Sequence, residues 1–84
     1  MTFTYSPKGV CSREMIIEVE NGMVQHLEVI GGCNGNLKGI ASLVQGMRIE
    51  DVIARLEGIT CGPRATSCPD QLAKALRQLQ SQNF

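Results

Sequence analysis

The residues of this 84-residue chain best suited to chemistry are its four cysteines, Cys11, Cys33, Cys61 and Cys68. Each stands beside a small or turn-forming residue, as in Gly31-Gly32-Cys33-Asn34-Gly35 and Thr66-Ser67-Cys68-Pro69-Asp70. If the four sulfurs converge, they could hold Zn²⁺ or an iron–sulfur cluster, act as a redox pair, or form disulfides. Their spacing matches neither C-x2-C knuckles nor a thioredoxin-like C-x-x-C motif. The choice among these chemistries therefore depends on where the fold places the sulfurs.

Composition and the pattern of apolar residues exclude some classes of binding partner and indicate a cellular compartment. Eight basic and eight acidic side chains give a formal net charge of zero, without the basic excess expected of a nucleic-acid-binding domain. No apolar run approaches the ~20 residues of a membrane-spanning helix, and the N-terminal residues lack the pattern of a signal peptide. We therefore expect a cytoplasmic protein with no nucleic-acid and no membrane partner. Because the cytosol keeps thiols reduced, ligand or redox roles are favoured over structural disulfides.

Two β-rich runs, residues 14–20 and 23–30, are joined by Asn21-Gly22, the strongest short signal for a hairpin. A two-residue turn pairs residues whose numbers sum to 43, so Val19 faces Val24, Ile17 faces His26 and Met15 faces Glu28. The apolar residues do not sort onto one face in this register, so either a bulge shifts it or both faces are partly covered. Extended outward, the register places Cys11 opposite residue 32, beside Cys33. Residues 2–6 are expected to add an edge strand.

Apolar residues at helical spacing predict three helices after the hairpin. Two stripes, over residues 37–44 and 49–56, stop at Gly46 and Gly58, and a third helix runs from Pro69 to about Gln80. The expected fold class is α+β: a small antiparallel sheet of two or three strands packed against three helices, in one domain over 1–84. Cys33 then precedes the first helix, Cys61 follows the second, and Cys68 is the N-cap of the third, where amide groups favour a thiolate.

The other polar residues and the glycine-rich segment are not expected to take part in chemistry. His26, the only histidine, is expected to be a half-exposed sheet residue far from the cysteines. Glu14, Glu50 and Asp51 are expected to be solvated, the latter two in a first helical turn that stabilises negative charge. The glycine-rich segment 31–35 lacks the G-x-G-x-x-G spacing and the Lys-Ser/Thr pair of phosphate-binding loops.

The segment Thr66-Ser67-Cys68-Pro69-Asp70 resembles the signature of the TSCPD family, over nearly the whole chain. Members are small four-cysteine bacterial proteins, and the domain also occurs at the C-terminus of some ribonucleotide reductases. The resemblance implies a metal-binding or reductase-associated role. A reductase active site does not fit in 84 residues, so the chain alone is not expected to reduce ribonucleotides.

The order of Cys11, Cys33 and Cys68 along these elements is more distantly similar to iron–sulfur cluster scaffolds of the IscU and NifU N-terminal type. In those scaffolds the matching cysteines hold a transient [2Fe–2S] cluster or zinc. This chain has Arg13 and Ser67 where the scaffolds have an aspartate and a histidine, and it has a fourth thiol, Cys61. Four thiolates suit a closed Zn²⁺ site or a more tightly held cluster, which disfavours cluster transfer.

The sequence therefore predicts a small metal-binding accessory or interaction protein. Its expected ligands are Cys11, Cys33, Cys61 and Cys68, its expected metal is Zn²⁺ or, alternatively, an iron–sulfur cluster, and its expected partner is a protein such as a reductase or a cluster-assembly protein. One alternative is a thiol redox protein that uses Cys61 and Cys68, and a second is a cluster scaffold. No complete active site is visible, and whether any reaction is catalysed stays open.

Overall fold

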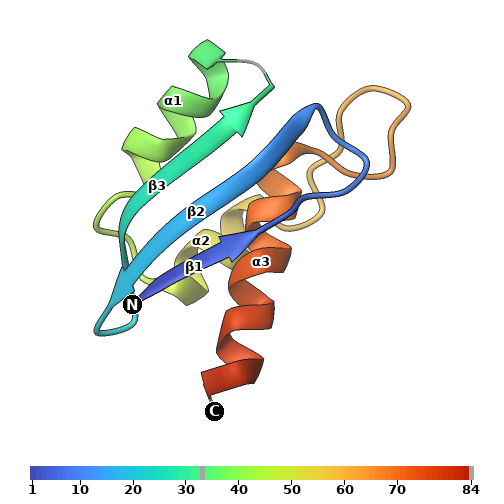
Figure 1. The fold of residues 1–84 in the computed structure, drawn as a ribbon. Coiled ribbons are helices and arrows are strands. Elements are labelled where there is room, and N and C mark those ends of the chain that lie inside the picture. Colours follow the sequence, from blue (N-terminus) through green and yellow to red (C-terminus); the bar gives the residue numbers. More distant parts are fainter. Residues whose placement is uncertain (33, 84) are drawn as a thin grey trace.

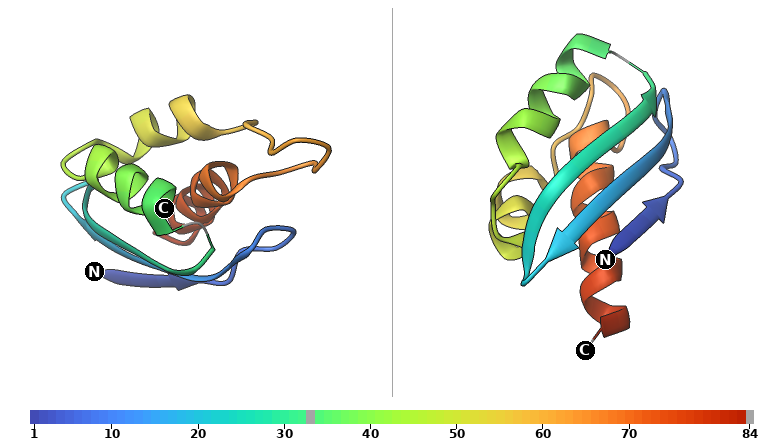
Figure 2. Two further views of the ribbon diagram at one scale, coloured as in Figure 1. Left: turned by 90° about the horizontal axis from the view of Figure 1, so that it is seen from above. Right: turned by 60° about the vertical axis from the view of Figure 1, so that its left-hand side comes forward.

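The computed structural model describes residues 1–32 and 34–83, and in these residues a three-stranded antiparallel sheet is covered on one face by three helices (Figures 1 and 2). The elements are β1 (Thr2–Tyr5), β2 (Ser12–Glu20), β3 (Met23–Gly31), α1 (Asn34–Val44), α2 (Ile49–Leu56) and α3 (Cys68–Asn83). The predicted α+β class is confirmed, including the edge strand, which pairs with β2. No helix in the described residues is both long enough and apolar enough to cross a bilayer.

The hairpin of β2 and β3 contains two bulges that the sequence did not locate. Asn21 and Gly22 form the turn, each with positive φ, as a type I′ turn requires. Val19 pairs with Val24 as predicted, but the register then shifts by one, so Ile17 pairs with Leu27 and Met15 with Val29. The predicted pairs of Ile17 with His26 and Met15 with Glu28 are therefore wrong.

The physical reason for the first bulge is burial. One extra residue on β3 brings three apolar pairs onto the same face of the sheet, where five of their six residues are buried and Val29 packs beside them. A second shift between Ser12 and Glu14 returns the register to its starting value, so Ser12 pairs with Gly31. The two bulges thus cancel at the open end of the hairpin.

The core lies between this inner face and α3. It is formed by side chains that are under a tenth exposed on β2, β3 and the helices: Met15, Ile17, Val19, Val24, Leu27, Val44, Ile49, Val52, Ile53, Leu72, Ala75, Leu76 and Leu79. The stripe of Leu72, Leu76 and Leu79 predicted on α3 is at most 1% exposed. His26 is a sheet residue, as predicted, but it pairs with Glu18 instead of Ile17 and is exposed instead of half-exposed. The packed helix α3 therefore holds its first residue, Cys68, at a fixed place near the open end of the hairpin.

Candidate cysteine site

The three cysteines that the structure describes line one pocket. Cys11, Cys61 and Cys68 surround a space of about 510 Å³ whose opposite wall is α1. Cys33, the fourth predicted ligand, lies outside the described residues. The described cysteines come from three segments: the end of the loop that follows β1, the loop between α2 and α3, and the first turn of α3. The fold therefore brings residues 50 and more positions apart in sequence to one hollow.

The hairpin delivers Cys11 to the place that the register predicted. Because Ser12 pairs with Gly31, the next residues out are Cys11 and Gly32. A Cβ atom on Gly32 would lie 3.3 Å from Cys11 Sγ and only 2.9 Å from Leu37 Cδ1, and Gly32 has a φ of +80°. Only glycine suits this conformation and this close approach. Gly32 directly precedes Cys33 in the sequence.

The Thr66-Ser67-Cys68-Pro69-Asp70 segment builds the start of α3. Ser67 Oγ accepts a hydrogen bond from the Asp70 N–H at 3.2 Å and donates one to the Ile59 carbonyl at 2.6 Å, and the Ser67 carbonyl accepts the first helical bond, from Gln71 N–H. These are the contacts of an N-cap residue. The prediction that Cys68 is the N-cap is therefore wrong, because the cap needs an oxygen acceptor and Ser67 supplies it. Cys68 becomes the first helical residue, and its side chain lines the pocket.

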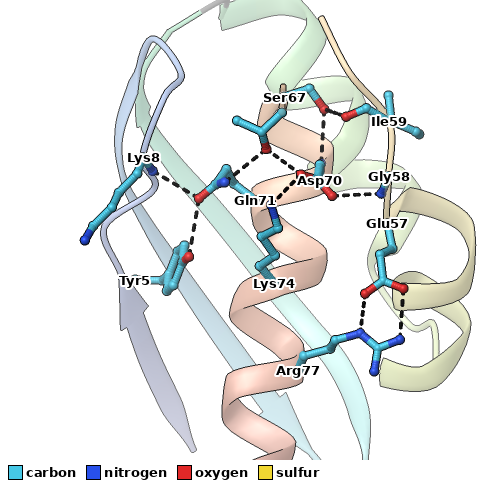
Figure 3. A network of polar contacts seen from close by, with 11 residues as sticks. Tyr5, Lys8, Glu57, Gly58, Ile59, Ser67, Asp70, Gln71, Lys74 and Arg77 are labelled. Atoms are coloured by element: carbon cyan, nitrogen blue, oxygen red, sulfur yellow. Dashed lines mark hydrogen bonds and ion pairs between the residues drawn. The ribbon is translucent and has the colours of Figure 1, made fainter. Parts of the chain in front are cut away.

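Asp70 anchors the loop between α2 and α3 (Figure 3). Its carboxylate accepts hydrogen bonds from Thr66 Oγ1 and from the Gly58 N–H, the latter at 2.8 Å, and pairs with Lys74 Nζ at 3.0 Å. The hydrogen bond from Thr66, with that from Gly58 and the charge of Lys74, lowers the pKa of Asp70 to about 2. The loop is thus held at both ends, at Gly58 and at Thr66, by one buried carboxylate.

Gln71 connects this loop to the segment that leads to Cys11. Its Oε1 accepts hydrogen bonds from the Lys8 N–H at 3.0 Å and from Tyr5 Oη at 3.3 Å, while its Nε2 donates to Thr66 Oγ1 at 3.0 Å (Figure 3). Arg64 Nη1 also donates to the carbonyl of Gly9, at 3.3 Å. The two loops that carry Cys11 and Cys61 therefore lie side by side, as Figure 1 shows for the blue and the pale orange loops.

Sequence reasoning missed two site residues, Ser12 and Gln71. Ser12 Oγ lies 3.2 Å from Cys68 Sγ, and either group can donate the hydrogen bond. Ser12 and Gln71 are 3% and 4% exposed. The position of Gln71 directly after Thr66-Ser67-Cys68-Pro69-Asp70 could have indicated its role, because Gln71 lies in the same helical turn as Cys68. The sequence carried no signal for Ser12, whose orientation depends on the second bulge.

The thiol sulfurs in the pocket are atoms that bind metals well, but they are not close enough together to hold one. Cys11, Cys61 and Cys68 are free thiols, and Cys11 and Cys61 are exposed while Cys68 is half-buried. Within residues 1–32 and 34–83, no three His, Cys, Asp or Glu side chains are close enough together to hold a metal ion. A metal held by these cysteines would therefore have to draw the thiols together from the wall of the pocket. Thiol sulfur is the ligand that Zn²⁺ and iron–sulfur clusters take most readily.

Comparison with known proteins identifies a family. A family model described as the TSCPD domain matches residues 3–80, which is nearly the whole chain. Searches of curated proteins and of solved structures each found no match. The likeness to IscU and NifU scaffolds thus stays a prediction.

Proposed function

This chain belongs to the TSCPD domain family, and from that premise we propose that its cysteines bind a transition metal, with Zn²⁺ first and an iron–sulfur cluster second. The observation that carries the proposal is the shared pocket: three thiols from three separate segments line it. Unrelated buried cysteines would not be expected to gather in this way, since free cysteine is most often an inert residue within a core. Here Cys11 and Cys61 are exposed.

The proposed ligands are Cys11, Cys33, Cys61 and Cys68. Four thiolates suit a closed tetrahedral site, and a metal so bound would cross-link the hairpin, the loop and α3. Two features of the chain support thiolate binding there. Cys68 lies at the N-terminal end of a 16-residue helix, where unpaired amide groups attract negative charge. Arg64 lies within the loop between Cys61 and Cys68, and its positive charge opposes the charge that thiolates bring.

The proposed role is that of an accessory protein with a protein partner, such as a reductase or a cluster-assembly protein. In the described residues the large apolar side chains that are exposed are Met1, Leu43 and Ile59. Leu43 is 76% exposed and lines the cysteine pocket, and Ile59 stands two residues before Cys61. Contiguous exposed apolar patches are typical of surfaces that bind other proteins, and we propose that Leu43 and Ile59 belong to such a surface.

The proposal is tested by metal analysis of protein purified without oxygen. We expect about one equivalent of zinc or one cluster per chain, and an unfolding midpoint that falls after chelation, because metal binding and local folding are coupled. The single variants Cys11→Ser, Cys33→Ser, Cys61→Ser and Cys68→Ser should each lose most of the metal, whereas Ser42→Ala, an exposed serine on α1, should retain it. Less than about 0.2 equivalents of any transition metal, with all four thiols freely titratable, would refute metal binding.

A second candidate, favoured by the place of Cys61 and Cys68 in one pocket, is thiol redox chemistry. The two thiols would lose two electrons and two protons as they form a disulfide, and a disulfide of the partner would gain them and become two thiols. Mild oxidation followed by peptide mapping would show a bond between Cys61 and Cys68. Absence of that bond, or a midpoint potential far outside about −220 to −320 mV, excludes this candidate.

A further inference from the structure

Ser12 is a buried hydroxyl beside one of the proposed ligands. It is the first residue of β2, is 3% exposed, and its Oγ lies 3.2 Å from Cys68 Sγ. A buried hydroxyl without a hydrogen-bond partner is costly, and nearly all such groups in proteins have one. Among the described residues, the sulfur of Cys68 is a partner of this hydroxyl. The pair joins β2 to the first turn of α3 across 56 positions of sequence.

The second bulge is the reason that Ser12, and not its neighbour, points at Cys68. Met15, Ile17 and Val19 alternate inward along β2, and an unbroken strand would continue this pattern to Arg13. The irregularity between Ser12 and Glu14 adds one residue, so Ser12 is buried and Arg13 is exposed, with its Nε close to Gly31. Bulges commonly redirect a side chain next to a functional site.

The backbone of Cys68 is already fixed, but its sulfur can still rotate. The Ser67 cap, the first helical bond and the packing of α3 hold the Cα atom in place. The χ1 angle of a cysteine has three staggered wells, and these send Sγ in different directions. A hydrogen bond from one side of the sulfur selects among the three directions.

We propose that Ser12 is a positioning residue of the cysteine site, whose hydroxyl donates to the sulfur of Cys68 and holds it in the rotamer that lines the pocket. A metal-bound cysteine has lost its thiol proton, so in that state the hydroxyl is the donor. Residues that hydrogen-bond to metal ligands orient them, and their loss weakens metal affinity by about 10- to 100-fold. The expected loss of metal affinity rests on the proposed function. The effect of Ser12 on the rotamer of the metal-free Cys68 thiol is independent of it.

The first arm of the test uses metal-free, reduced protein. Three-bond NMR couplings across Cα–Cβ of Cys68 should report one χ1 rotamer in the wild type. In Ser12→Ala they should report averaging over several rotamers, while Ser42→Ala, an exposed serine on α1, should leave them unchanged. Ser12→Thr, which keeps the hydroxyl, should retain the single rotamer. Averaging in the wild type would overturn the inference without any variant, and so would an unchanged rotamer in a folded Ser12→Ala.

The second arm measures zinc affinity by competition with a chromophoric chelator. Ser12→Ala should bind Zn²⁺ about 10-fold more weakly than the wild type, and Ser12→Thr and Ser42→Ala should bind it within a factor of about two. If the wild type binds no metal while the rotamer still depends on Ser12, the proposed function fails and the positioning role stands. If the wild type binds zinc and Ser12→Ala binds it equally well, the role of Ser12 in metal binding is refuted.

Discussion

The carboxylate of Asp70 holds the loop between α2 and α3 against the helix, and the substitution Asp70→Asn tests that role. Asparagine has nearly the same shape, and one side-chain oxygen can still accept from the Gly58 N–H. It cannot carry the negative charge that pairs with Lys74, and its amide group is a donor where Thr66 Oγ1 needs an acceptor. The substitution therefore removes the charge and the hydrogen bond from Thr66, while it keeps the shape of the side chain and the bond from Gly58.

The size of the effect follows from the pKa of Asp70. The folded chain holds this pKa at about 2, against an ordinary value of 3.8, a difference worth about 2 kcal/mol of stability at neutral pH. Because 1 kcal/mol shifts the unfolding midpoint of a domain of this size by about 4–8 °C, Asp70→Asn should melt roughly 8–16 °C lower at pH 7.

The contribution of the Asp70 carboxylate to stability depends on pH. A carboxyl whose folded pKa is lowered stabilises the fold above its unfolded pKa and loses that contribution as pH falls through the folded pKa. The wild type should therefore lose its advantage over Asp70→Asn between about pH 4 and pH 2. Urea unfolding followed by circular dichroism, repeated at several pH values, measures the difference directly.

A matched control separates this carboxylate from surface charge. Asp51 lies in the first turn of α2, its side chain is 46% exposed, and it pairs with Arg48 at 3.1 Å. Asp51→Asn should cost much less than Asp70→Asn, because water screens an exposed pair. If wild type and Asp70→Asn differ by the same free energy at pH 7 and at about pH 2, the buried charge is not the source of the stabilisation, and the reasoning fails.

Three further substitutions, two of them with a matched control, test the elements around the pocket by thermal and urea unfolding. Gly32→Ala should destabilise by about 1–3 kcal/mol, because a side chain is strained at a φ of +80° and its Cβ would lie 3.2 Å from the backbone nitrogen of Ser12 and 2.9 Å from Leu37 Cδ1. Gly39→Ala, with open space in a helix, should be neutral or stabilise by up to about 1 kcal/mol; equal effects of the two substitutions on stability would contradict the strain and the close approach at Gly32. Ser67→Ala should cost about 1–2 kcal/mol through loss of the cap of α3, and Ser42→Ala, on an exposed face, should cost almost nothing. Leu76→Ala, which empties a fully buried position of the core, should cost about 2–5 kcal/mol, and a value under about 1 kcal/mol would show that α3 is not packed as described.

Local signals predicted most of the fold. Asn21-Gly22 predicted the hairpin turn, because few other pairs of residues adopt a positive φ at both positions. Helical stripes ending at glycines gave α1 and α2, and the leucines of α3 gave its buried face. The register of the hairpin could be extended only by assuming that it had no bulge. The predicted register was wrong in the middle of the hairpin, where the pairing of apolar residues shifts the strands by one residue. It was right at the open end, where a second bulge cancels that shift.

From the sequence one could tell which residues can do chemistry and where the hairpin turns, since turn geometry is a local rule. That Cys11 comes beside Gly32 depends also on two bulges that cancel each other. Tertiary structure alone decided that Cys61 and Cys68 share a pocket with Cys11, because this depends on how α3 packs against the sheet and on the bonds of Asp70 and Gln71. It also decided that Ser67 caps α3 and that Ser12 faces the Cys68 sulfur. The cap of a helix depends on which side-chain oxygen reaches its first amide groups, and a bulge depends on which face of the sheet must be buried. Packing between distant segments of the chain settles both.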